Sequence, residues 1–191
     1  HPIIPYSTKI IPFAWWDGAF SKEELDWMQL KAKEAKQEAG LGQHSIIDEN
    51  IRSANLNWVK SNNESEWIFE RLSHVVSCIN SEHFNFDLTG LFERLQFTHY
   101  DESKNGHYTW HQDFGAGNRP SRKLSVVLQL SNPEEYEGGE LRLLNSADHT
   151  SIEKKRGLIV LFPSWTLHQV TPVTKGNRQT LVTWVTGPAF K

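Results

Sequence analysis

The sequence has almost no cysteine and no long apolar run. Cys78 is the only cysteine among 191 residues, which excludes an internal disulfide and any zinc or iron–sulfur site built from several cysteines. The longest clear apolar run, Leu158 to Phe162, has five residues, far fewer than the ~20 of a membrane-spanning helix. The first residues show no basic segment followed by an apolar one, so we expect no signal peptide. These absences together predict a cytoplasmic chain that does not enter the membrane.

A surplus of positive charge is also missing. Twenty Lys and Arg residues stand against 23 Asp and Glu residues, for a formal net charge of −3. A protein that binds nucleic acid needs cations for the phosphates, so we expect no nucleic-acid partner. The chain is 38% hydrophobic and 12% aromatic, which is enough to build a core and excludes wholesale disorder.

Two stretches in the first half have the apolar spacing of helices. Ser21 and Glu24 fit a capping box, an apolar stripe follows over 25–39, and Gly40 supplies a stop signal. A second stripe predicts a helix from about Glu64 to Asn80. Both stripes are typical of helices that pack on a core.

The second half changes to short β-branched and aromatic runs separated by turn residues. The candidate strands are Phe92–Tyr100, Leu124–Leu130, Glu140–Leu144, Gly157–Phe162 and Arg178–Thr186. Short strands without intervening helices predict an antiparallel sandwich or jelly roll. We therefore expect one domain over 1–191, with a mainly β fold: a helical and mixed support region over 1–90 and a β core over 91–191.

One short motif in this β region has the spacing of a metal site. His111 and Asp113 are two residues apart, so on an extended chain their side chains point to the same side. His168 is the candidate third ligand. Two histidines and one carboxylate leave three coordination positions open, as in non-haem Fe(II) oxygenases. The motif alone is a weak signal, since a histidine taken singly is more often structural.

The last predicted strand adds an anion-binding candidate. The guanidinium group of Arg178 can form two parallel hydrogen bonds to a carboxylate. Because side chains alternate along a strand, Trp184 lies on the same face of this strand as Arg178. On the strand Phe92–Tyr100, the face that carries Gln96 and Tyr100 is too polar for a core. That face fits either a pocket wall or an exposed edge strand.

The order of these motifs resembles a known family. Three groups of segments are similar to successive motifs of the prolyl 4-hydroxylase-like (PKHD-type) 2-oxoglutarate/Fe(II) oxygenases. The segments are 95–100 and 106–113, then 122–125, 130–133 and 136–141, and finally 157–163, 168–173, 176–178 and 184–185. The likeness covers roughly 91–188, about half of the chain.

The resemblance implies a fold, a site and a reaction. The fold is a double-stranded β-helix, or jelly roll, buttressed by the N-terminal helices. Fe(II) is held by His111, Asp113 and His168, and the site uses 2-oxoglutarate and O₂, with ascorbate as an additional candidate. The reaction is hydroxylation of an unactivated C–H bond with release of succinate and CO₂. The residues implied around 2-oxoglutarate are Arg178 for its far carboxylate, Tyr100, Trp184 and Gln129, where some relatives have Tyr in place of this Gln.

The substrate is less well specified than the reaction. The family favours a prolyl residue in a peptide or protein, and a free amino acid or other small molecule is the alternative. Candidate substrate contacts are Tyr108, Trp110, Arg119 and Arg122, for which packing of the aromatics and solvation of the arginines are the competing interpretations. For Arg52 and Trp58, the sequence favours a position away from the mouth of the site over one that reaches it.

Two other classes of function compete with an oxygenase. A non-catalytic jelly-roll binding module would tolerate loss of a ligand or of Arg178, yet all four residues are present. A zinc hydrolase could use the same three ligands, but it gives no reason for Arg178 or Trp184 and lacks an obvious general base.

Overall fold

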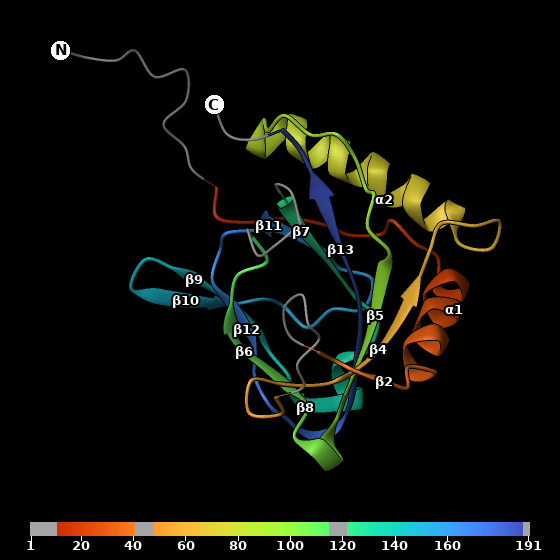
Figure 1. Cartoon of the computed structure of the whole chain (residues 1–191), viewed down its shortest axis with the longest axis vertical. Coiled ribbons are helices and arrows are strands. Elements are labelled where there is room, and N and C mark those ends of the chain that lie inside the picture. Colours follow the sequence, from red (N-terminus) through yellow and green to blue (C-terminus); the bar gives the residue numbers. More distant parts are fainter. Residues whose placement is uncertain (1–10, 41–47, 115–121, 189–191) are drawn as a thin grey trace.

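The computed structural model describes residues 11–40, 48–114 and 122–188. Most of its elements are β-strands, which form two antiparallel sheets (Figure 1). No helix in these ranges combines the length and the apolar character needed to cross a membrane.

The larger sheet supplies one wall of the fold. Its main path runs β1-β11-β7-β13-β5-β4-β2, and β8 pairs with β13 beside this path. The strands, in that order, are β1 (Ala14–Trp16), β11 (Ile159–Pro163), β7 (Arg122–Gln129), β13 (Val173–Thr186), β5 (Leu95–Asp101), β4 (Asn55–Val59), β2 (Gln37–Glu38) and β8 (Tyr136–Gly138).

The smaller sheet faces the larger one in the order β10-β9-β12-β6-β3. Its strands are β10 (Asp148–Ser151), β9 (Leu141–Asn145), β12 (His168–Val170), β6 (His107–His111) and β3 (Arg52–Ser53). Two antiparallel sheets with long connections between neighbouring strands form a jelly roll. The predicted fold class is therefore confirmed.

Two helices cover the outer face of the larger sheet (Figure 1). They are α1 (Lys22–Lys33) and α2 (Glu66–Ile79), and a π-helical turn, Asn80–Phe84, continues the second. Strand residues of one parity, such as Phe97 and Leu181, pack with the helices in one apolar cluster. Residues of the other parity face the smaller sheet. The helices thus buttress the sheet, as predicted.

Two predicted elements have different ends in the structure, the first helix and the last strand. The capping box of Ser21 and Glu24 is present, but the prediction that the first helix continues to Gly40 is wrong. It ends at Lys33, because Gln37 and Glu38 pair with β4 as an edge strand. The last strand begins at Val173 instead of Arg178, since β13 also pairs with β8.

Candidate metal and cosubstrate site

Three side chains from two neighbouring strands meet between the sheets. His111 ends β6, Asp113 follows it by two residues, and His168 begins β12, directly opposite His111 in the register. Asp113 Oδ1 lies 3.9 Å from His111 Nε2, and Asp113 Oδ2 lies 3.4 Å from His168 Nε2. The three ligand atoms lie within 4.8 Å of one another. They are close enough to share one metal ion.

Both histidines are held in the tautomer that a metal requires. His111 Nδ1 lies 2.7 Å from the carbonyl oxygen of Thr109, and His168 Nδ1 lies 2.9 Å from that of Thr166. A carbonyl oxygen only accepts, so each Nδ1 carries the proton and each Nε2 keeps its lone pair. Burial is the main reason that the pKa of His111 falls from 6.5 to about 3, and His168 lowers it further. The His111 ring is therefore neutral at physiological pH.

Asp113 is kept ionised by its neighbours. Burial alone would raise the pKa of this carboxyl group, but His168, His111 and the hydroxyl of Ser125 outweigh it and bring the pKa to about 2. Ser125 Oγ donates to Asp113 Oδ2 at 2.7 Å. The indole N–H of Trp184 also lowers the pKa of Asp113, although its Nε1 makes no hydrogen bond of good geometry. Two imidazole nitrogens and one anionic carboxylate are the donor set that fits Fe(II).

The buried side chain of Arg178 lines the same cleft. Arg178 is only 3% exposed, and its Nε has no hydrogen-bond partner in the described structure. Its guanidinium carbon lies 5.4 Å from the centre of the Tyr100 ring, and Tyr100 and Trp184 also line the cleft. An unpaired buried guanidinium is costly unless an anion joins it. The carboxylate of 2-oxoglutarate therefore fits this position.

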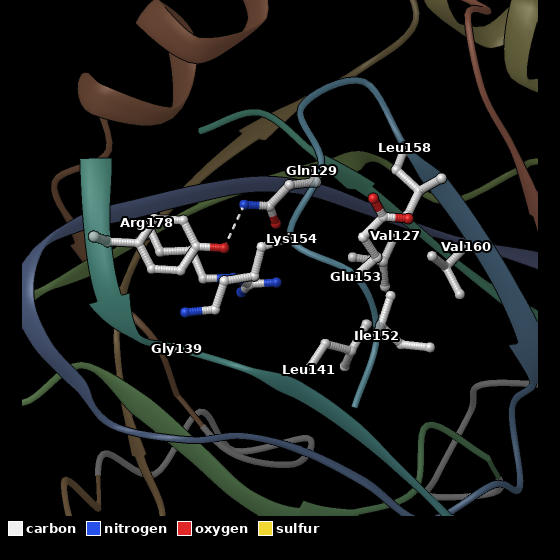
Figure 2. A pocket seen from close by; sticks show the side chains of 11 residues that line it. Val127, Gln129, Gly139, Leu141, Ile152, Glu153, Lys154, Leu158, Val160 and Arg178 are labelled. Atoms are coloured by element: carbon white, nitrogen blue, oxygen red, sulfur yellow. Dashed lines mark hydrogen bonds between the residues drawn. The ribbon is translucent and has the colours of Figure 1, made fainter. Parts of the chain in front are cut away.

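Gln129 and Arg178 both line a second small cavity (Figure 2). Arg178, Val127 and Leu141 line both spaces. The amide of Gln129 donates to the Tyr136 hydroxyl oxygen at 2.9 Å. Since that oxygen accepts, the hydroxyl proton of Tyr136 remains able to donate to a carboxylate near Arg178. The sequence did not single out Tyr136, which reaches this cavity only because β8 pairs with β13.

Of the two aromatic residues predicted to contact the substrate, Tyr108 lies in the cleft and Trp110 lies outside it. Tyr108 lines the cleft and stacks on His111, with ring centres 3.4 Å apart. An irregularity in the β6–β12 pairing, where Val170 faces Tyr108 and His168 faces His111, brings both to the same face. Trp110 is not part of the cleft; it is 40% exposed and lies edge-on to His149.

Of the two arginines predicted as substrate contacts, the structure places only Arg122. Arg122 is buried, ion-paired through its fork with Glu93, and stacked 3.6 Å from the centre of the Trp184 ring. Arg122 thus lines the cleft as an ion-paired side chain, and its role as a substrate contact stays a prediction. Arg119 lies outside the described residues.

The first half of the chain contributes residues that the sequence had placed away from the site. Arg52 on β3 and Trp58 on β4 both line the cleft. Trp58 lies 6.3 Å from Trp184 between ring centres. No local motif indicates this, because the pairing of β3 with β6 and of β4 with β5 brings these residues in.

The residues that build this site coincide with a known sequence family. Residues 95–186 match the family model described as the 2OG-Fe(II) oxygenase superfamily. This region belongs to that superfamily. Membership implies Fe(II), 2-oxoglutarate and O₂. The two histidines and Asp113 fit the metal, and Arg178, whose Nε has no partner among the described residues, fits a carboxylate.

Sequence relatives carry the name PKHD-type hydroxylase. The chain is 42% identical over 84 residues to one from Psychrobacter sp., a match covering 41% of this chain and 32% of that protein. It is 47% identical over 62 residues to one from Shewanella sp. strain ANA-3, covering 32% of this chain and 28% of the relative. The matched segments span about a third of the length of these curated relatives.

Solved structures share the fold over most of the chain. A prolyl hydroxylase from Trichoplax adhaerens, in complex with a hypoxia inducible factor peptide fragment, superposes with a TM-score of 0.76 at 18% identity, over 92% of this chain and 84% of that one. A Pseudomonas putida prolyl-4-hydroxylase gives 0.73 at 19% identity, over 92% of both chains. At these identities the likeness establishes the jelly-roll fold of the oxygenase region together with its helices.

Proposed function

We propose that this chain is an Fe(II)- and 2-oxoglutarate-dependent hydroxylase that acts on a prolyl residue of a peptide or protein. The observation that carries the proposal is the buried, unpaired Arg178 in the same cleft as the His111, Asp113 and His168 cluster. A metal hydrolase would need a general base beside the metal, and Asp113, already used as a ligand in this proposal, is the only carboxylate among the described residues that line the cleft.

Each of these residues has a role in the proposed mechanism. His111, Asp113 and His168 would hold Fe(II). Arg178 receives the far carboxylate of 2-oxoglutarate, with the Gln129–Tyr136 pair at the end of the cavity. When bound, iron and 2-oxoglutarate supply the oxidising chemistry with O₂ and release succinate and CO₂.

The remaining cleft residues position the substrate and limit solvent. Tyr100, Trp58 and Trp184 wall the cleft, and Tyr108 offers an aromatic face beside His111 on which a proline ring can stack. The empty space, its open mouth included, is about 760 Å³. The prolyl substrate is supported by the structural neighbours from Trichoplax adhaerens and Pseudomonas putida, both of which are prolyl hydroxylases.

The proposal is tested by mass spectrometry on proline-containing peptides incubated with the protein, Fe(II), 2-oxoglutarate and O₂. We expect one added oxygen atom on proline, matched by an equal amount of succinate. His111→Ala should abolish both products, whereas His74→Ala, on the exposed face of α2, should retain them. Hydroxylation of free amino acids but of no peptide would overturn the prolyl assignment. Absence of succinate with every substrate would overturn the oxygenase assignment.

A further inference from the structure

Arg52 is a second buried cation in the cleft. It is 8% exposed, and its Nε has no hydrogen-bond partner within the part of the chain that the structure describes. Among the described residues, no carboxylate forms an ion pair with it. Its guanidinium carbon lies 4.5 Å from the centre of the Tyr108 ring, and Glu38 and Glu49 line a small neighbouring cavity with Arg52 without forming an ion pair to it. An arginine so deeply buried normally has an anion beside it.

The position of Arg52 differs from that of Arg178. Arg52 belongs to β3 of the smaller sheet and is paired in register with Tyr108, whereas Arg178 belongs to β13 of the larger sheet. Tyr108 lies between Arg52 and His111 in a stack of three side chains. Arg52 therefore stands beside the metal ligands, on the strand pair that carries His111.

A count of charges shows that the cleft can accept one more anion. Arg122 is neutralised by Glu93, so among the described residues that line the cleft the remaining charged side chains are Arg52, Arg178 and Asp113. A divalent ion raises their sum to three positive charges, and the dianion 2-oxoglutarate cancels two. One positive charge remains, and Arg52 is the cation that 2-oxoglutarate leaves unpaired when it binds Arg178.

We propose that Arg52 binds a carboxylate of the substrate, close to the atom that is hydroxylated. The proposal rests on the proposed function, since it assumes that 2-oxoglutarate takes Arg178. The carboxylate has two possible sources: the α-carboxylate of a free amino acid or chain end, or an acidic side chain next to the target residue in a peptide. Both offer the planar pair of oxygens that a guanidinium fork recognises.

The test measures binding, without turnover, in protein loaded with redox-inert Zn(II) and saturated with 2-oxoglutarate. Isothermal titration compares two isosteric pairs: N-acetylproline against its amide, and Ac-Pro-Asp-NH2 against Ac-Pro-Asn-NH2. Acetate, followed by NMR line broadening, serves as a minimal probe that presents the carboxylate alone. Arg52→Gln is compared with Arg71→Gln, which removes a guanidinium ion-paired with Glu24 on the helical face.

We expect the acid of at least one pair to bind about tenfold or more tightly than its amide, as charge-assisted hydrogen bonds allow. Arg52→Gln should remove this preference and the saturable acetate signal while 2-oxoglutarate still binds, and Arg71→Gln should retain both.

A preference in the first pair alone identifies a free α-carboxylate, and one in the second pair alone identifies an acidic side chain. Equal binding within both pairs and no saturable acetate signal, or a preference that survives Arg52→Gln, would overturn the proposal. Failure of Zn(II) and 2-oxoglutarate to bind the wild type would instead overturn the proposed function.

Discussion

The two histidine ligands are oriented by their own backbone neighbourhoods. Each Nδ1 donates to a carbonyl oxygen two residues earlier, Thr109 for His111 and Thr166 for His168. This local hydrogen bond fixes both the ring plane and the tautomer before any ion arrives. Such preorganisation lowers the cost of ordering the ligands when the metal binds.

Asp113 depends on a side chain instead, which leads to a first prediction. Ser125 Oγ donates to Asp113 Oδ2 at 2.7 Å and is itself 3.1 Å from Ser164 Oγ. Ser125→Ala should weaken metal binding by roughly 10- to 100-fold, because the carboxylate loses its orienting donor. Competition titration with a metal-chelating dye measures this change. The control is Ser77→Ala, on the exposed side of α2. Unchanged affinity in Ser125→Ala would show that the hydrogen bond does not orient the ligand.

A second prediction concerns the shape of the anion-binding group. Arg178→Lys keeps the positive charge but loses the planar fork, so we expect the KM for 2-oxoglutarate to rise by about tenfold or more. Metal affinity should stay unchanged, since Arg178 is not a ligand. Steady-state kinetics with varied 2-oxoglutarate tests this. A variant with the wild-type KM would mean that a point charge suffices and that the fork does not grip the carboxylate.

At the residue scale, the sequence predicts those site residues whose spacing follows strand alternation. His111 and Asp113 converge, and Arg178 and Trp184 share the face that lines the cleft. Arg52 and Tyr136 could not be found in this way, because strand pairings distant in sequence bring them to the site. Long-range pairing leaves no periodic signal in a short stretch of sequence.

At the scale of elements, the contact between β8 and β13 fixes the approach of the chain to Arg178. Gly176 pairs with Tyr136, and its backbone N–H donates to Glu102 at 2.7 Å. Gly176 has a φ of +70°, and a Cβ there would lie 2.0 Å from the carbonyl oxygen of Glu135. Only glycine allows the two strands to lie so close at this point.

A third prediction follows for this contact. Gly176→Ala should lower the free energy of unfolding by at least about 2 kcal/mol, because left-handed strain adds to a backbone clash. Gly18→Ala is the matched control: its φ is +74°, but no atom lies within 4 Å of the added Cβ. Urea unfolding of both variants separates clash from strain. Equal losses in the two variants would contradict the close approach of β8 and β13.

The predicted elements fail mainly at edges and in short strands. The helix starting after Ser21 was predicted from its cap, but its end was not, because Gln37 and Glu38 pair with β4. Strands of two or three residues such as β3 are too short to show alternation. The long strands β7 and β13, by contrast, overlap the predicted runs because their patterns extend over many residues.

At the scale of the whole molecule, the helices and the larger sheet share one apolar cluster. Leu72 of α2 and Met28 of α1 are fully buried against strand residues such as Leu128. The other face of the same sheet carries the cleft. The helical support and the metal site are therefore two sides of one layer.

A fourth prediction tests this shared layer. Leu72→Ala should destabilise the protein by about 2–5 kcal/mol through the cavity it leaves. Leu30→Ala, on the exposed side of α1 with 53% of its surface accessible, should change stability by less than about 0.5 kcal/mol. Thermal unfolding followed by circular dichroism measures both. A small effect of Leu72→Ala would show that α2 does not support the sheet.

The central claim is that one cleft binds a metal ion through His111, Asp113 and His168 and 2-oxoglutarate through Arg178. The most direct measurement is the visible absorption spectrum of the protein reconstituted with Fe(II) and 2-oxoglutarate under anaerobic conditions. We predict the weak charge-transfer band of the chelate in the wild type, its absence in His111→Ala, and a higher 2-oxoglutarate requirement in Arg178→Ala. A wild-type protein that binds Fe(II) but never develops the band, at any 2-oxoglutarate concentration, would contradict the claim.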